Sequence, residues 1–374
     1  MPTPAEFRRN FPSLNELTYL ASCSQGALSE TVAAALQEYQ DSLFEHGAAW
    51  ERWETQVEHS RRHFARSINA AEHEIAVVPS LSAAAYQVVS TRDWTQRSRI
   101  VSTDLEFPSL GHVWLAQEPS VAYVEDRAGV VYAEDYTALL DESCGLVSIP
   151  LASYRNGVRL PVREVIEQAR TFGVPTFVDA YQAAGVEPID VQELECDFLA
   201  AGAMKYLLGV PGIAFLYVRD GVLDAHDPVA TGWFGRQDPF AFDPRRLDYP
   251  DTARRFESGT PSIPAAYAAV AGLQLLESVD PKTVRNHIAD LGQYCHDALT
   301  ADGERIGSPA DRSLRGAQVA VRDGAPGDLA KYLAERGIIT SPRGDLLRIA
   351  FHYYSTSDDV EAVVRAIADY RRSR

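Results

Sequence analysis

The chain has 374 residues, of which 46% are hydrophobic and 23% charged, a composition typical of a globular protein with a sizeable core. Its formal net charge of -17 predicts a surface that repels nucleic acid and anionic membranes, so we expect neither as a partner. Four scattered cysteines without a CxxC pair disfavour a disulfide framework or a metal site, and the N-terminus lacks an apolar signal segment, so we expect a soluble, cytoplasmic protein without bound metal.

Helix and strand patterns alternate through the first two thirds of the chain, and a smaller region of helices and strands follows. In chain order, the pattern predicts helices over 29–44 and 50–69, a strand over 74–80, a helix over 82–90, strands over 99–107 and 145–153, a helix over 162–173, strands over 174–180, 197–202 and 212–218, and helices over 264–279, 282–301 and 357–372. This alternation is typical of an α/β protein with a mostly parallel central sheet and helices on both faces.

The chain is long enough for a large domain and a smaller one. We expect the large domain to cover residues 15–255 and a small α+β domain to cover 256–374 together with 1–14. An irregular stretch rich in Pro, Asp, Arg and aromatic residues covers 225–258, and its length indicates a functional loop or a subunit contact.

Lys205 is the most informative single residue. Only three of the thirty-five basic residues are lysines, and Lys205 is the one charged residue in the apolar run from 198 to 218. Burial favours the neutral amine of a lysine, which can attack a carbonyl to form a Schiff base. Its position alone leaves open the alternative of a lysine that extends its ammonium group to solvent.

Asp179 and Gln182 give Lys205 a chemical context. Asp179 stands at the end of a predicted strand, where ligands of parallel sheets bind, and Gln182 follows three residues later. Pyridoxal phosphate needs a lysine for its aldehyde, a carboxylate for its ring nitrogen and a hydrogen-bond donor near its phenolic oxygen. These three residues therefore predict a pyridoxal-phosphate site, whereas an aspartate that merely caps a helix would explain Asp179 alone.

The stretch FVDAYQAAGVEPIDVQELECDFLAAGAMKYLLGVPGIAFLYVR resembles the core of the class V aminotransferase family, and the resemblance extends over nearly the whole chain. That family includes cysteine desulfurases, selenocysteine lyases, kynureninases and isopenicillin N epimerases. The resemblance implies the fold of fold-type I pyridoxal-phosphate-dependent transferases, with a mostly parallel sheet in a large domain and a smaller α+β domain at the C-terminus. It also implies pyridoxal 5′-phosphate as the cofactor.

The resemblance extends to cofactor-binding residues. PSLSAA matches the phosphate loop of the family, so Leu81 would contribute its backbone N–H, and Ser82 both its N–H and its hydroxyl. A serine-capped helix without a ligand is the alternative for this motif. EFPS resembles the segment whose aromatic residue stacks on the cofactor ring, which would be Phe107, a residue that could otherwise belong to the core.

Two further motifs imply a partner subunit and a substrate anchor. RRFESGTPS resembles the loop that crosses a dimer interface, so the chain would form a homodimer in which Thr260 binds the partner's phosphate. LLRIAFHYYSTSDDV resembles the strand that supplies the arginine for the substrate carboxylate, which would be Arg348, with Arg343 as the second candidate. One of these two arginines could instead pair with acidic neighbours. Trp233 is a candidate for the wall of the substrate pocket, or a packing residue.

Several positions depart from the family pattern. Met204 precedes the lysine where desulfurases have a histidine, and Gly202 stands where many relatives have a serine that contacts the phosphate. Tyr154 stands where several relatives have an asparagine beside the phenolic oxygen. The segment 337–345 contains no cysteine, whereas a desulfurase that passes sulfur through a persulfide needs a mobile one.

The resemblance thus implies an enzyme that acts on an L-amino acid through a Schiff base to the cofactor and a carbanion at Cα, with Lys205 as the base. We expect a lyase that eliminates a C–S-type group from the β-carbon, without persulfide transfer. An aminotransferase, with or without coupled decarboxylation, and an epimerase are the alternatives. A non-catalytic protein of the same fold and an NAD-dependent enzyme are disfavoured, the second because no GxGxxG motif follows an early strand.

Overall fold

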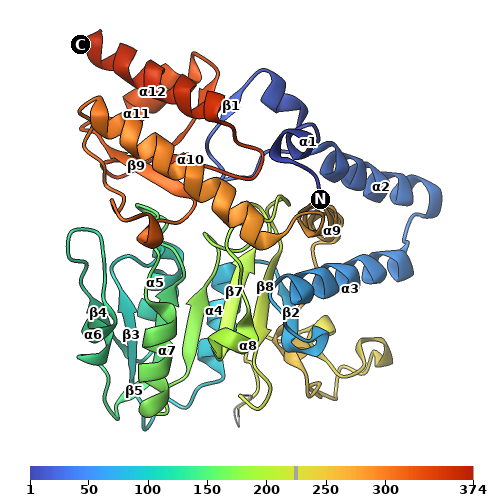
Figure 1. Cartoon of the computed structure of the whole chain (residues 1–374). Helices are drawn as coiled ribbons and strands as arrows, with labels where there is room; N and C mark the ends of the chain where they lie inside the picture. Colours follow the sequence, from blue (N-terminus) through green and yellow to red (C-terminus); the bar gives the residue numbers. More distant parts are fainter. Residues whose placement is uncertain (223–225, 374) are drawn as a thin grey trace.

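The structure, a computed structural model, describes residues 1–222 and 226–373. A large β-sheet flanked by helices forms one part of the molecule, and the C-terminal helices with a small sheet lie above it (Figure 1). The N-terminal segment lies beside the C-terminal region, although the two are far apart in the sequence (Figure 1). None of the helices in the described residues combines the length and the apolar character needed to cross a bilayer.

The central sheet has seven strands in the order β2-β8-β7-β6-β5-β3-β4. These strands are β2 (Ile75–Val78), β3 (Arg99–Thr103), β4 (Ser120–Val124), β5 (Cys144–Pro150), β6 (Thr176–Asp179), β7 (Phe198–Gly202) and β8 (Ala214–Val218). Among the described strands of this sheet, β8 alone runs opposite to the other six, which are parallel to one another. The predicted α/β architecture with a mostly parallel sheet is confirmed.

Both faces of this sheet are buried. The helices that cover them are α3 (Trp50–Ser67), α4 (Leu81–Ser90), α5 (Pro108–Leu115), α7 (Val162–Thr171) and α9 (Ile263–Glu277). In β2, Val77 belongs to the core formed with α3, α7 and α9, whereas Ala76 and Val78 belong to the core formed with α4 and α5. This alternation explains why the strands read as continuous apolar runs, because successive side chains point to opposite faces.

A second core joins the N-terminal segment to the last third of the chain. Its elements are α1 (Pro4–Arg8), β1 (Thr18–Tyr19), α10 (Pro281–Ala301), β9 (Gln318–Arg322), α11 (Pro326–Ala334), β10 (Ile338–Ile339), β11 (Ser341–Arg343), β12 (Leu346–Ala350) and α12 (Ser357–Arg372). Strands β11, β12 and β9 form an antiparallel sheet, and β1 pairs with β10. The division into domains of 15–255 and 256–374 with 1–14 stays a prediction, and residue 374 lies outside the described residues.

The predicted helices are present close to their expected ends, including α2 (Glu30–His46), whose first turn is capped by Ser29. The expected strand over 99–107 is wrong in its second half. Strand β3 ends at Thr103, and α5 begins at Pro108 because a proline fits the first turn of a helix. Residues 226–258 are irregular as expected, and residue 225 lies outside the described residues.

The remaining elements are short. They are α6 (Ala133–Thr137), α8 (Val191–Leu194) and the 3-10 turns η1 (Pro12–Asn15), η2 (Glu72–Glu74), η3 (Trp233–Gly235), η4 (Pro239–Ala241), η5 (Ala253–Phe256) and η6 (Arg312–Leu314). Three of these turns, η3, η4 and η5, give the irregular segment its only regular hydrogen bonding in the described part of the chain.

A buried ion pair ties the end of the irregular segment to α3 and the sheet. Nη1 of Arg61 lies 2.6 Å from Oε1 of Glu257, and the two side chains are 3% and 5% exposed. The same carboxylate oxygen accepts the backbone N–H of Val77 at 2.9 Å. Separation of the pair would leave two buried charges without a counter-charge, which is costly, so the pair fixes the position of the segment that leads to Thr260.

Replacement of Arg61 by methionine should lower the free energy of unfolding by about 3–5 kcal/mol, because Glu257 would stay buried without its counter-charge. Urea-induced unfolding followed by circular dichroism measures this. Arg62→Met on the same helix is the matched control, since Arg62 and its partner Glu72 are 40% and 51% exposed. We expect that control to cost at most about 1 kcal/mol. Equal losses for the two variants would contradict the proposed importance of the buried pair.

Candidate active site

A cavity of about 320 Å³ lies at the carboxyl ends of the sheet strands, and the β11–β12 hairpin contributes to its wall. It brings together most of the residues that the sequence predicted for the site: Leu81, Ser82, Phe107, Tyr154, Asp179, Gln182, Lys205, Arg343 and Arg348. The predicted residues Thr260 and Trp233 do not line it.

Lys205 occupies the turn between β7 and β8, and hydrogen bonds hold the backbone on both sides of it. The carbonyl oxygen of Met204 accepts the N–H of Gly26 at 2.8 Å. The carbonyl oxygen of Tyr206 lies 3.0 Å from Nε2 of the fully buried His352. The N-terminal segment and the C-terminal region thus fix the lysine turn from two sides, and His352 is a structural neighbour of the site.

Lys205 is buried beside two aromatic rings. The residue is 8% exposed, and Nζ lies 4.1 Å from the ring centroid of Tyr181 and 5.4 Å from that of Phe107. Burial lowers the pKa of the Lys205 ammonium to about 8, although the negative charge of Asp179 opposes this. The turn therefore holds an amine that is neutral in a substantial fraction of molecules near physiological pH, which is the form that attacks carbonyls.

Asp179 ends β6 and is 5% exposed. Its Oδ1 accepts the N–H of Tyr181 at 2.7 Å. Burial raises the pKa of the Asp179 carboxyl, and the hydrogen bond from Tyr181 and the charge of Lys205 act in the opposite direction. A buried carboxylate such as Asp179 suits the protonated ring nitrogen of a pyridine, because the positive charge of that nitrogen would keep the carboxylate ionised.

Glu106 is a second buried carboxyl, next to Phe107 of the cavity wall. It accepts the hydroxyl of Ser148 at 2.8 Å and the N–H of Phe107 at 2.9 Å. Burial, and then the charge of Asp179, raise the pKa of Glu106. We infer that Glu106 is the protonated member of the pair when Asp179 is ionised, since two adjacent carboxylates in a water-poor site repel each other.

Aromatic and amide groups complete the wall of the cavity. Phe107 caps α5 and meets the ring of Tyr154 edge-on, with centroids 5.0 Å apart. Nε2 of Gln182 donates to the carbonyl of Cys23 at 3.1 Å, which fixes the orientation of the amide. This set offers a ring face, a phenol and an amide, as a planar cofactor with a phenolic oxygen requires.

The N-terminus of α4 opens toward the same cavity. The hydroxyl of Ser80 accepts the N–H of Ala83 at 3.1 Å, which caps the helix. Leu81 and Ser82, the first two residues of the helix, line the cavity, and the N–H groups of a first helical turn have no partner within the helix. These donors and the helix dipole fit a phosphate group.

Arg348 on β12 is 1% exposed and rigidly held. Its Nη1 donates to the carbonyl of Tyr154 at 2.8 Å, Nε to the carbonyl of Ser341 at 3.2 Å, and Nη2 to the hydroxyls of Ser24 and Ser341 at 3.0 and 2.7 Å. A guanidinium has five N–H donors, so one at Nη1 is left for a ligand. A two-point contact with a carboxylate would require the exchange of one serine hydroxyl.

Thr260 and Trp233 lie outside this cavity in the single chain. Thr260 lines a smaller space of about 140 Å³, which shares Gly212 and Ile213 with the main cavity. Trp233 packs in an aromatic cluster with Trp50, 5.3 Å away between ring centroids, and its Nε1 donates to the carbonyl of Pro239 at 2.7 Å. The roles predicted for these two residues stay predictions.

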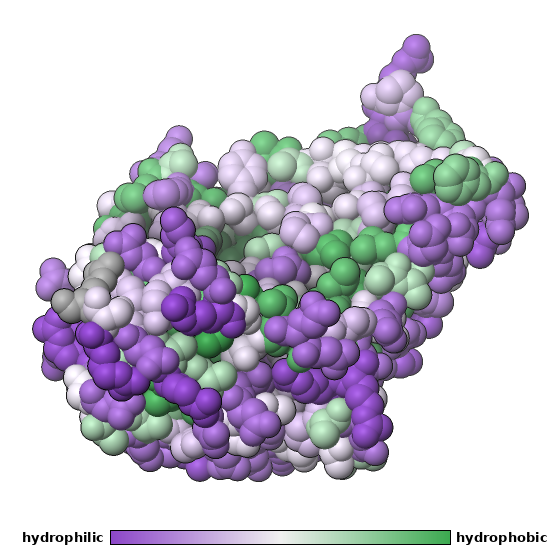
Figure 2. Space-filling model, turned by 90° about the horizontal axis from the view of Figure 1, so that it is seen from above, coloured by the Kyte–Doolittle hydropathy of each residue, from purple (hydrophilic) through white to green (hydrophobic). Residues whose placement is uncertain are grey.

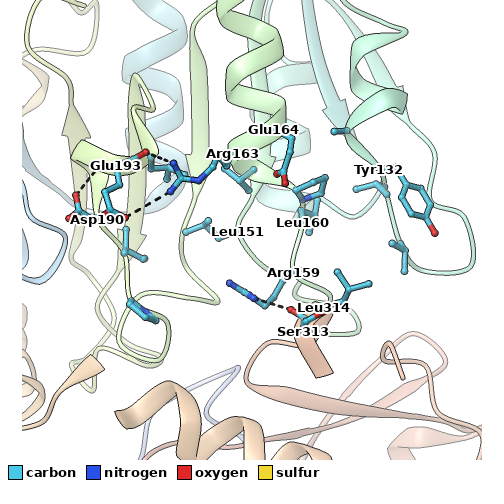
Figure 3. Close-up of a pocket in the computed structure, with 18 of the residues that line it drawn as sticks. Tyr132, Leu151, Arg159, Leu160, Arg163, Glu164, Asp190, Glu193, Ser313 and Leu314 are labelled. Atoms are coloured by element: carbon cyan, nitrogen blue, oxygen red, sulfur yellow. Dashed lines mark hydrogen bonds and ion pairs between the residues drawn. The ribbon is translucent and has the colours of Figure 1, made fainter. Parts of the chain in front are cut away.

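A larger groove of about 830 Å³ lies elsewhere, between α7, α8 and η6. Figure 3 shows Arg159 opposite Ser313, whose carbonyl accepts Nη1 of Arg159 at 2.9 Å, and Arg163 bonded to the carbonyl of Glu193 at 2.7 Å. None of the predicted site residues lines it. Its arginines are occupied by neighbouring groups, so the smaller cavity, where a neutralisable amine meets a buried carboxylate, is the candidate active site.

The sequence did not point to several residues of the cavity. Tyr181, Cys23 and Ser24 line it, and Glu106 and Ser341 support its walls through Phe107 and Arg348. Glu106 carried a signal that was available, since it is a carboxylate next to Phe107 at the end of a predicted strand. Cys23 and Ser24 precede any recognisable motif, and only the chain fold brings them to Lys205.

Comparisons with known proteins bear on this site. The family model described as aminotransferase class-V matches residues 18–363. The uncharacterized aminotransferase YcbU of Bacillus subtilis is 38% identical over 368 residues, which are 98% of this chain and 97% of that protein. A kynureninase of Deinococcus radiodurans is 27% identical over 381 residues, 97% of this chain and 92% of that protein.

Solved structures share the fold. The apo structure of cysteine desulfurase from Thermococcus onnurineus NA1 superposes with a TM-score of 0.88 at 21% identity and covers 100% of this chain and 99% of that one. The cystine C-S lyase C-DES, in complex with its product cysteine persulfide, superposes with a TM-score of 0.87 at 21% identity, covering 96% of this chain and 99% of that one. At this identity the likeness shows the fold, and the predicted fold-type I architecture is confirmed.

Competitive labelling of the cofactor-free protein with a small amine reagent should show half-maximal reaction of Lys205 near pH 8. The exposed Lys282 and Lys331 are the controls within the same chain and report the pH dependence of the reagent itself. Asp179→Asn should move the Lys205 midpoint to lower pH, because a negative charge that stabilises the ammonium is removed. Mass spectrometry of peptides gives the three profiles separately, and superimposable profiles for all three lysines would contradict the buried amine.

Proposed function

This chain belongs to the aminotransferase class-V family of pyridoxal-phosphate enzymes, and we propose that it is a lyase that eliminates a C–S-type group from the β-carbon of a small L-amino acid, without persulfide transfer. The observation that carries the assignment of the site is the juxtaposition of Lys205, Asp179 and Arg348 in one cavity. The surroundings of Lys205 suit a Schiff base, those of Asp179 suit a protonated ring nitrogen, and those of Arg348 suit a substrate carboxylate.

Pyridoxal phosphate, when bound, accepts the electron pair that is released at the α-carbon of the substrate. Lys205 would hold the cofactor through Nζ, and its free amine would be placed to take a proton from the α-carbon of the substrate. Asp179 would bind the ring nitrogen and keep it protonated. The buried position of both groups strengthens their interaction, because little water screens it.

The other predicted cofactor contacts follow from the walls of the cavity. Phe107 would cover one face of the cofactor ring, Gln182 and Tyr154 would contact the phenolic oxygen, and Leu81 and Ser82 would bind the phosphate with the N-terminus of α4. The support for these roles is that all five residues line the cavity that holds Lys205.

Arg348 binds the substrate carboxylate through its remaining N–H at Nη1, and rotation of the hydroxyls of Ser24 and Ser341 releases a second donor. Arg343 is exposed at the end of β11 and attracts the anionic substrate to the cavity entrance. Trp233 does not line this cavity in the single chain, so its predicted role at the substrate requires the partner subunit.

Two observations support elimination without persulfide transfer. Strands β11 and β12 are joined by a two-residue turn, Gly344 and Asp345, so no loop before Arg348 can carry a thiol to the substrate. The cavity of about 320 Å³ is at the low end of the range for small-molecule sites, about 300–1,000 Å³, and it has to take the cofactor as well. This volume favours a substrate as small as cysteine.

An aminotransferase is the second candidate. It is favoured by the relative at 38% identity, which carries that description, and the same Lys205 would return the proton to the cofactor side instead. An epimerase would return the proton to the α-carbon on the opposite face. All three outcomes use the same residues up to removal of the α-proton, so they are separated by products.

The protein acts as a homodimer in this proposal, and Thr260 reaches the phosphate of the partner subunit. The small space beside Thr260 adjoins the main cavity, and the chain exposes large apolar side chains such as Phe44 and Phe242, at 86% and 69%. Figure 2 shows apolar patches between the hydrophilic regions of one face. We also place the protein in the cytoplasm, as four free thiols suggest.

Lys205→Ala should abolish the absorbance of the Schiff base between the cofactor and the protein, together with all turnover, because no other described residue offers an amine in the cavity. Absorption spectra of the purified variant and the parent protein test this. Retention of the parent spectrum in Lys205→Ala would remove Lys205 from its proposed role.

Incubation of the parent protein with a panel of amino acids should yield pyruvate, ammonia and a released thiol from a cysteine-like substrate. Cys23→Ala should release sulfide at the same rate as the parent protein if no persulfide forms, since Cys23 is the one cysteine among the described residues that lines the cavity. Absence of pyruvate, with a loss of visible absorbance that an added α-keto acid restores, would reject the lyase and establish the aminotransferase.

Mixing Lys205→Ala subunits with Thr260→Ala subunits should restore cofactor binding and activity above the sum of the two variants. In a mixed dimer, one site has Lys205 from one chain and Thr260 from the other, and is therefore complete. Subunit exchange followed by cofactor titration measures this gain. If Thr260 served the site of its own chain, both sites of the mixed dimer would stay incomplete and no gain would appear.

A further inference from the structure

We propose that Tyr181 is a further ligand of the cofactor, and that its hydroxyl binds the phosphate from the position above Gly202 that a side chain at 202 would otherwise occupy. The inference rests on the cofactor of the family and not on the choice between lyase and aminotransferase. It concerns a residue that lines the cavity and that no sequence motif indicated.

The ring of Tyr181 occupies the space above Gly202. A Cβ added at Gly202 would lie 2.1 Å from Cζ and 2.2 Å from the hydroxyl oxygen of Tyr181. Such distances are far below any tolerated contact, so the two positions are coupled: the phenol can stand here only because residue 202 has no side chain. Because Gly202 in β7 has no Cβ, a side chain from the loop after β6, that of Tyr181, fills the space that a side chain at 202 would take.

Gly202 is aligned, across two neighbouring strands, with the end of β2, which leads into α4. The sheet register pairs Gly202 with Ala214, and Ala214 with Val78, the last residue of β2 before the turn into α4. Ala200 and Val78 belong to the core on the α4 face, and a side chain at 202 would point to that face as well, since alternate strand residues share a face. Tyr181 packs against the same core.

The hydroxyl of Tyr181 therefore lies on the side of the cavity where the first N–H groups of α4 converge. Among the described residues, this hydroxyl makes no hydrogen bond, whereas its backbone N–H is bonded to Asp179. Burial, and then the charge of Asp179, raise the pKa of Tyr181 to about 12. The phenol stays protonated over the working range and is a donor suited to an anionic oxygen.

The ring has a second contact that fits this arrangement. Nζ of Lys205 lies 4.1 Å from the ring centroid of Tyr181. One side chain thus touches the amine that holds the aldehyde end of the cofactor and, at its hydroxyl, reaches toward the phosphate end. Nζ of Lys205 thus has two aromatic rings near it, that of Tyr181 and, at 5.4 Å, that of Phe107.

The test compares two ligands that cannot bond covalently to Lys205, pyridoxamine 5′-phosphate and pyridoxamine, by calorimetric titration of the cofactor-free full chain. Tyr181→Phe should weaken binding of the phosphorylated ligand by roughly tenfold or more and leave binding of pyridoxamine unchanged, as expected for the loss of one hydrogen bond to a charged group. Tyr154→Phe is the matched control in the same cavity, and it should change both affinities by the same factor.

A coupled pair of substitutions keeps the inference falsifiable if Tyr181→Phe is poorly folded. Gly202→Ser should destabilise the parent protein, because Tyr181 fills the space, and should be tolerated in the Tyr181→Ala background. The double variant places a hydroxyl at the same spot and should regain part of the preference for the phosphorylated ligand over pyridoxamine. A folded double variant that keeps the low preference of Tyr181→Ala would contradict the inference.

The possible failures are distinguishable. Equal weakening of both ligands by Tyr181→Phe, or no change in either, would overturn the role of Tyr181 and leave the cofactor in place. Failure of the parent protein to bind either ligand would remove the cofactor and this inference with it. The identity of the reaction products enters none of these measurements.

Discussion

The structure depends on keeping one amine, that of Lys205, in a water-poor cavity beside a buried carboxylate. A lysine in such a place costs free energy unless a neighbouring charge and aromatic faces compensate, and Asp179, Tyr181 and Phe107 supply that compensation. The turn that carries the lysine is held at the carbonyls on both sides of it, by Gly26 and by His352. The residual cost of burial appears as a lowered pKa, and this is what makes the amine reactive.

The segment that leads from β1 toward α2 joins the two cores at this point. Ala21 bridges to Ala350, the last residue of the strand that carries Arg348, and Ser24 bonds to the guanidinium of Arg348. The carbonyl of Cys23 accepts Nε2 of Gln182, which follows β6 of the large sheet. Gly26 comes within hydrogen-bond distance of the lysine turn because it has no Cβ, which would lie 2.4 Å from the carbonyl oxygen of Lys205. A short N-terminal stretch therefore sets the distance between the groups that hold the cofactor and those that hold the substrate.

Differences in burial and in neighbours give side chains of the same chemical type different roles in this cavity. Asp179 and Glu106 are neighbouring buried carboxyls, and only one of them is beside the amine, so the ionised form settles on Asp179 while Glu106 keeps its proton and supports Phe107. Arg348 is buried and held by four hydrogen bonds, whereas Arg343 is exposed. Position in the fold, rather than residue type, decides which side chain binds the cofactor or substrate, which one supports the cavity wall and which one attracts the substrate.

The sequence by itself determined the class of the fold, the ends of most helices and the central residues Lys205, Asp179 and Gln182, because apolar periodicity and a lone charge in an apolar run are local signals. It misplaced the end of β3, where Pro108 allows a helix to start, and gave no sign of Tyr181, Ser24 or the hydrogen bonds around the lysine turn. Those features depend on contacts between segments far apart in the sequence, such as Ser24 with Arg348, and on a missing Cβ whose meaning appears only when another side chain fills the space. Tertiary structure decided them, since packing between distant segments follows from shape and not from spacing along the chain.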